Sequence, residues 1–123
     1  MARIALTVTE IVRAGVARPA GQVPTDTGNP ALLAEFVNDG RTIIEVTIGT
    51  GPRSLTVLTP GVVDADLLVG DRVFPTLAGS SVTLIGPFPP SIYNQSGANA
   101  GKVLLDGDSG QQAQYTFRTY RVP

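Results

Sequence analysis

Short runs of β-branched residues, each ended by glycine or proline, recur along most of this chain. The clearest run is Thr42–Ile48, and residues 54–59 alternate in polarity after a Gly-Thr-Gly-Pro turn. β-branched side chains favour strands, whereas glycine and proline favour turns. We therefore expect a hairpin over about residues 41–59. Seven or eight such strands predict an all-β protein, folded as a single antiparallel β-sandwich of the Ig-like or jelly-roll-like kind.

Further strands are expected toward both ends of the chain. Residues 3–9 alternate apolar and polar side chains and predict a first strand. Residues 32–38 predict either one helical turn or a strand, and Asp39-Gly40 then gives a hairpin signal. Residues 112–122 predict the last strand. The side chains expected on one face of it are Ala113, Tyr115 and Phe117. Shorter strands are expected at residues 71–75, 81–85 and 102–106.

The N-terminal region contains a proline-rich segment. Residues 17–30 read ARPAGQVPTDTGNP and predict an extended loop or arm without regular structure. Compact domains rarely carry so long a loop unless it has a function, so it either contacts a neighbour or is a mobile surface loop. We divide the chain into an extended N-terminal strand and arm, residues 1–30, and a β-sandwich domain, residues 31–123.

A second proline cluster lies between the strands at 81–85 and 102–106. Pro87, Pro89 and Pro90 follow Gly86 within five residues. Proline fixes φ and has no N–H, so we expect this corner neither to join a helix nor to lie in a central strand. The pattern predicts two strands joined by a rigid surface corner.

Charged residues make up 15% of the chain, against about 25% in typical globular domains. This is compatible with burial against other subunits, and equally with a small sandwich whose outer face carries Ser and Thr. The net charge of −1 gives no electrostatic sign of nucleic acid or anionic lipid as a partner. No stretch approaches the roughly 20 apolar residues of a membrane span. The N-terminus lacks the pattern of a signal peptide, so we expect synthesis in the cytosol and a soluble product.

The chain offers little for catalysis or metal binding. It has no cysteine and no histidine, which removes the usual ligands of zinc, iron and copper and the usual base of a catalytic triad. Asp64 and Asp66 either form a carboxylate pair for acid–base chemistry or, as we favour, lie in a solvated loop or pair with a nearby arginine. Residues 106–110, DGDSG, begin like a calcium loop but fit a β-turn better. We expect no enzyme, no catalytic residue, no cofactor and no metal.

Three segments together resemble small virion proteins of tailed bacteriophages, namely residues 6–16 (LTVTEIVRAGV), residues 28–46 and residues 82–106. The most specific element is Gly-Pro-Phe-Pro-Pro at 86–90 with Ile-Tyr-Asn at 92–94. The resemblance is to head decoration (cement) or minor capsid proteins, which are often encoded beside the major capsid protein. It concerns general pattern and carries no catalytic residues.

The resemblance implies a β-sandwich bound to the outside of an icosahedral shell, at three-fold or quasi-three-fold positions. Its partners would be the major capsid protein and copies of itself, as a trimer, and its place would be the virion, assembled in the host cytoplasm. Two capsid contacts are expected: an arm at residues 3–30 that adds to a sheet edge, and the proline corner. The candidate contact residues are Arg3, Ile4, Leu6, Arg13, Arg18, Pro19, Pro24, Pro87, Phe88, Pro89, Pro90 and Tyr93.

Two other functions stay open. One is another virion component, such as a head–tail connector or tail protein. The other is a carbohydrate- or cell-surface-binding β-sandwich module, although such modules usually display exposed aromatic platforms, often of tryptophan, and this chain has no tryptophan.

Overall fold

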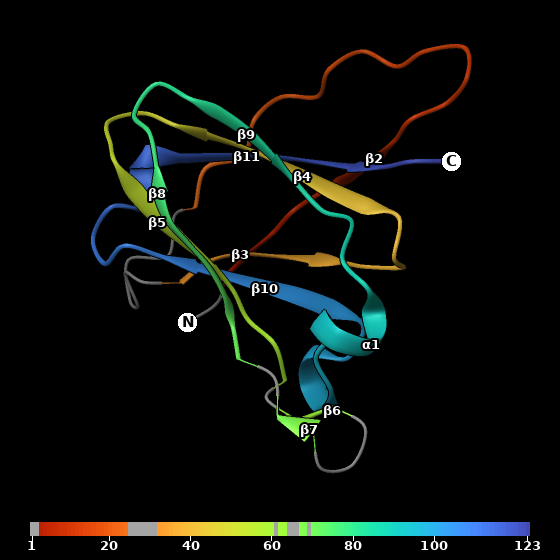
Figure 1. Cartoon of the computed structure of the whole chain (residues 1–123). Coiled ribbons are helices and arrows are strands. Elements are labelled where there is room, and N and C mark those ends of the chain that lie inside the picture. The colour runs from red at the N-terminus through yellow and green to blue at the C-terminus, as the bar shows by residue number, and fades with distance from the viewer. Residues whose placement is uncertain (1–2, 25–31, 61, 64–66, 69) are drawn as a thin grey trace.

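The computed structural model of the chain describes residues 3–24, 32–60, 62–63, 67–68 and 70–123. Two packed β-sheets form it, with one short α-helix at one end (Figure 1). The predicted all-β sandwich is therefore confirmed. Asp64, Asp66 and residues 25–31 of the proline-rich segment lie outside the described residues.

Nine strands build the two main sheets. Sheet A has the order β1 (Ile4–Ala5), β3 (Leu32–Val37), β10 (Lys102–Gly107), β5 (Arg53–Val57) and β8 (Arg72–Leu77). Sheet B has the order β2 (Val8–Glu10), β11 (Tyr115–Arg121), β4 (Thr42–Ile48) and β9 (Val82–Ile85). A separate pair is formed by β6 (Val62–Val63) and β7 (Leu67–Leu68). The helices are α1 (Pro90–Tyr93) and two 3₁₀ turns, η1 (Gly97–Asn99) and η2 (Gln112–Gln114).

Both sheets are mixed rather than purely antiparallel, because the N-terminal strands enter in parallel. β1 runs parallel to β3, and β2 runs parallel to β11. Residues 3–9, expected as one strand, are thus two strands in different sheets. The chain passes between the sheets at Leu6, whose side chain is buried in the core. Alternation of polarity is the same for one strand as for two, so this crossing leaves no local signal.

The chain changes sheet at every connection between these strands except that from β5 to β8. The hairpin expected over residues 41–59 is therefore wrong: β4 lies in sheet B and β5 in sheet A, and residues 49–52 cross between them. The Asp39-Gly40 turn also connects two sheets, since β3 is in sheet A. β4 already has a neighbour on each side, β11 and β9, so no edge of it is left for β5.

The core lies between the sheets and follows the period-two alternation of the strands. On sheet B, Ile44 and Val46 of β4 face inward beside Tyr115 and Phe117 of β11, and all four are buried. Sheet A contributes side chains that include Phe36, Leu55, Val57, Val103 and Leu105. Ala113 was expected to share the face of Tyr115 and Phe117, but this is wrong. It lies in η2 and is exposed, because the strand begins only at Tyr115.

Candidate functional site

The predicted contact residues at positions 3, 4 and 6 make contacts within the protein's own fold. Leu6 is buried in the core, and Ile4 packs against it. Arg3 donates from Nη2 to the Asp106 carboxylate at 2.6 Å, and both side chains are largely buried. These three side chains hold the N-terminus in the sandwich, so they are not part of its exposed surface.

Residues 12–18, the projecting loop, are all exposed. The loop extends beyond the sandwich in the orange-red part of the chain (Figure 1). Val12 is 49% exposed and Val16 46%. The loop turns at Gly15, whose φ of +94° favours glycine. Arg13 has no ion-pair or hydrogen-bond partner within the described part of the chain. The loop thus presents apolar and cationic side chains that the core does not use.

The base of the projecting loop is fixed on the outer face of sheet B. Glu45 of β4 accepts from Arg18 and, at 3.3 Å, from Arg118 Nη1. Tyr120 Oη donates to the other Glu45 oxygen at 3.4 Å. Arg118 Nε also donates to the Pro19 carbonyl at 2.9 Å. The hydrogen bond to Glu45 raises the pKa of the Arg18 guanidinium. Arg18, one of the predicted contact residues, is thus exposed but forms an ion pair with Glu45.

Where the loop returns to the sandwich, its backbone extends sheet B. Gln22 exchanges two backbone hydrogen bonds with Phe117, at 2.9 and 2.8 Å. Pro24, predicted as a contact residue, is buried. The projecting loop is therefore held at both ends, by β2 before it and by this bridge after it.

The proline corner is divided between surface and core. Pro87, Pro89 and Pro90 are exposed, whereas Phe88 is buried. The corner was expected not to join a helix, but Pro90 is the first residue of α1. Proline is tolerated there because an N–H in the first turn has no intrahelical partner to lose.

Two ring contacts and a buried amide hold the corner. The Phe88 ring lies 5.5 Å from that of Phe36 and 5.4 Å from that of Tyr93, centroid to centroid. Asn38 donates from Nδ2 to the Phe88 carbonyl at 2.9 Å and to Asn94 Oδ1 at 2.7 Å. Asn94 donates back to the Asn38 carbonyl at 3.1 Å. Phe88 and Tyr93 thus act as internal anchors, which present the three prolines at a fixed position.

The strand predicted at residues 81–85 exposes two apolar side chains that the sequence analysis did not name as contact residues. In β9, Val82 is 56% exposed and Leu84 64%. Alternation could have revealed them, because both lie on the face opposite to the buried Ile85.

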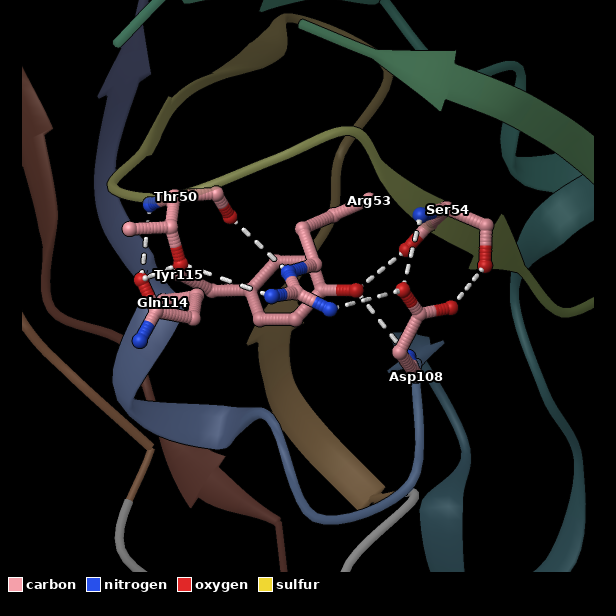
Figure 2. A network of polar contacts seen from close by, with 6 residues as sticks. All are labelled: Thr50, Arg53, Ser54, Asp108, Gln114 and Tyr115. Carbon is pink, nitrogen blue, oxygen red and sulfur yellow. Dashed lines mark hydrogen bonds and ion pairs between the residues drawn. The ribbon is translucent and has the colours of Figure 1, made fainter. Parts of the chain in front are cut away.

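A polar network closes the end of the sandwich where β5, β10 and β11 meet (Figure 2). Tyr115, fully buried, donates from its hydroxyl to the Ser54 carbonyl and accepts from the Asp108 amide at 3.0 Å. Asp108 also accepts from the Ser54 hydroxyl and lies 3.8 Å from Arg53 Nη1. Gln114 accepts from the Thr50 amide at 2.7 Å. Burial raises the pKa of the Tyr115 phenol, so it stays protonated and able to donate.

The two carboxylates of the calcium-like motif have partners in this fold. Asp106 pairs with Arg3, and Asp108 belongs to the network of Figure 2. Across the described ranges, no three His, Cys, Asp or Glu side chains gather in a way that could hold a metal ion. In the same ranges no helix has the length and apolar character needed to cross a membrane.

A hollow of about 340 Å³ lies between β2 and the end of β11. Its wall includes Glu10, Arg13, Arg41 and Arg121. Arg121 is paired with Glu10 at 2.7 Å and with Asp39 at 3.1 Å. A backbone hydrogen bond from Arg41, assisted by the Arg121 charge, lowers the pKa of Asp39. Most of the charge in this hollow is thus compensated internally.

No protein-family model, no curated protein and no solved structure matches this chain.

Proposed function

We propose that this protein is a structural component of a phage virion, which binds the outer surface of the capsid and stabilises it. The observation that carries the proposal is the projecting loop. Its residues 12–18 bury nothing in the protein's own core, yet both ends of the loop are fixed. An exposed segment on a rigid frame suits a binding surface, because little conformational freedom is lost on docking.

Val12 and Val16 supply the apolar part of this contact, and Arg13 supplies an exposed guanidinium that has no partner among the described residues. Burial of the valines favours association, and the guanidinium can bind a carboxylate of the major capsid protein. The exposed prolines of the corner form a second contact, already rigid before binding. Because the binding energy exists only in the assembled shell, it stabilises the assembled state. Many copies, joined also by contacts between them, multiply a modest individual affinity.

The test is the binding of purified protein to expanded, undecorated shells of the major capsid protein of the same phage. We expect saturation at hundreds of copies per shell and survival of the decorated shells at higher temperature. The double variant Val12→Asp/Val16→Asp should bind at least about tenfold more weakly, since two apolar contacts are lost and two charges are added. The matched control is Val37→Asp/Val73→Asp, which alters two similarly exposed valines of sheet A.

The control should bind as the unaltered protein does. Absence of binding to shells would contradict the proposal, as would equal binding by the loop variant. Purified virions that contain only about six or twelve copies would instead indicate a ring-shaped connector or tail component.

A further inference from the structure

The edges of the two main sheets differ in how well they are protected against pairing with another chain. β1 and β2, at one edge of each sheet, have two and three residues. β8, at the other edge of sheet A, carries Arg72 and Pro75. β9, at the other edge of sheet B, has the sequence Val-Thr-Leu-Ile, without charge, proline or glycine (Figure 1). Natural edge strands usually carry such protective features, so β9 is the exception in this fold.

The backbone of β9 is available for a further strand. Ile48 of β4 donates to the Ser81 carbonyl at 3.0 Å. In an antiparallel ladder such hydrogen-bonded pairs recur every two residues. Thr83 and Ile85, opposite Val46 and Ile44, therefore direct their N–H and C=O groups toward β4. The N–H and C=O groups of Val82 and Leu84 consequently point to the open edge.

The side chains at this edge are apolar and electrostatically neutral. Val82 and Leu84 are more than half exposed on the outer face of sheet B. The cross-strand neighbour of Leu84 on β4 is Glu45, whose charge is compensated by Arg18 and Arg118. A second strand laid along this edge meets no uncompensated charge from β4 or β9.

We infer that β9 pairs with β9 of a second copy of this chain, antiparallel across a two-fold axis centred at Thr83. This register places Val82 opposite the partner subunit's Leu84, and Leu84 opposite the partner subunit's Val82. Both pairs have the outward backbone groups that an antiparallel hydrogen-bonded pair requires. The four side chains form one apolar cluster on the outer face, and no like charges oppose one another.

A two-fold contact of this kind closes on itself, so it yields a dimer. We therefore propose a dimer in solution, where the resemblance implied a trimer. The two copies join their B sheets into one continuous eight-stranded sheet. The contact does not rest on the proposed capsid function, and its test requires only the isolated protein.

The first experiment is sedimentation velocity of the full chain over a concentration series, with hydrogen exchange under the same conditions. We expect a concentration-dependent dimer and slower exchange of the Val82 and Leu84 amides as the dimer forms. Val82→Lys should weaken dimerisation at least about tenfold, because it removes two apolar cross-strand pairs per dimer. Val73→Lys on β8, a similarly exposed valine, is the matched control and should change it less than twofold.

A second experiment reports the register directly. The chain has no cysteine, so Thr83→Cys gives a protein with a single thiol. At the two-fold axis the two residues 83 form a non-hydrogen-bonded pair with Cα atoms about 4.5 Å apart, which a disulfide can bridge. We expect Thr83→Cys to oxidise readily to a covalent dimer, whereas Thr76→Cys on β8 should not.

Three results would overturn the inference. They are a protein that stays monomeric at millimolar concentration, a dimer that Val82→Lys leaves intact, and Thr83→Cys that links no faster than the control. If Val82 and Leu84 become protected only on capsid shells, the edge binds a strand of the capsid protein instead. Shell binding by a monomeric protein would leave the proposed function standing while this inference fails.

Discussion

Replacement of Tyr115 by phenylalanine removes one oxygen atom from the polar network of Figure 2 and leaves the buried ring in place. That oxygen donates to the Ser54 carbonyl and accepts from the Asp108 amide. Both groups are partly buried, so each loses its partner with only limited access of water. A backbone group left without a partner in this way costs about 1 kcal/mol, at the low end of the range for buried groups. We expect Tyr115→Phe to lower the free energy of unfolding by about 2 kcal/mol.

Urea unfolding followed by circular dichroism measures this change, and thermal unfolding should show a Tm lower by about 8 °C for a chain of this length. The control is Tyr120→Phe, because the Tyr120 hydroxyl donates to Glu45 only over a long 3.4 Å and its other partner, Arg18, is exposed. We expect the control to change stability by less than about 0.5 kcal/mol. A loss below about 0.5 kcal/mol for Tyr115→Phe, or equal losses for both variants, would refute the view that this hydroxyl joins β5, β10 and β11.

Four further predictions concern pH and packing. Since burial raises the pKa of Tyr115 above its usual value of 10.0, the folded state keeps a proton that the unfolded state releases. Stability should therefore fall as pH rises above 10, more steeply than in Tyr115→Phe, in urea titrations across that range. The lowered pKa of Asp39 gives stability the opposite pH dependence. The ionised Asp39 contributes to the free energy of unfolding above pH 3.8, and this contribution should be lost as the pH falls further. Asp39→Asn should abolish this part of the pH dependence in acid titrations. Gly107→Ala should cost about 1–3 kcal/mol in urea unfolding, because a Cβ there would lie 2.7 Å from both Leu33 Cδ1 and Tyr115 Oη; a neutral result would mean that these side chains shift freely. Phe88→Ala should cost about 3–5 kcal/mol by the same assay, whereas Pro89→Ala, on the exposed side of the corner, should cost less than about 0.5 kcal/mol.

The positions of the strands were largely predictable from local sequence, and their membership of a sheet was not. The β-branched run Thr42–Ile48 forms β4, and alternation correctly indicates that Ile44, Val46 and Ile48 face inward. The turn after it has ordinary hairpin chemistry, yet it crosses between the sheets. This turn packs against another turn 28 residues away, since at Gly51 a Cβ would lie 2.6 Å from the Gly79 backbone. Such a contact has no signal in either turn alone.

For the candidate binding surfaces, the exposure of single residues was predictable from the sequence, but the contacts that hold these surfaces in place were not. The prolines at 87, 89 and 90 are exposed as their chemistry suggests, but the burial of Phe88 depends on Phe36 and on the Asn38 amide, both in other elements. The base of the projecting loop depends on Glu45, which meets Arg18 and Arg118 from distant parts of the chain. Residues so far apart give no pattern of spacing, so only the assembled sheets bring them together.

The position of β11 has a consequence for how the protein is made. β11 lies between β2 and β4 in sheet B, and among the described strands it is the only neighbour of β2. A ribosome releases the N-terminus first, so β2, β4 and β9 emerge well before residues 115–121 have cleared the exit tunnel. Until then the inward face of sheet B lacks Tyr115 and Phe117 and leaves Ile44 and Val46 exposed to water. The nascent chain therefore completes its sandwich late, when β11 inserts between β2 and β4, which have already been synthesised.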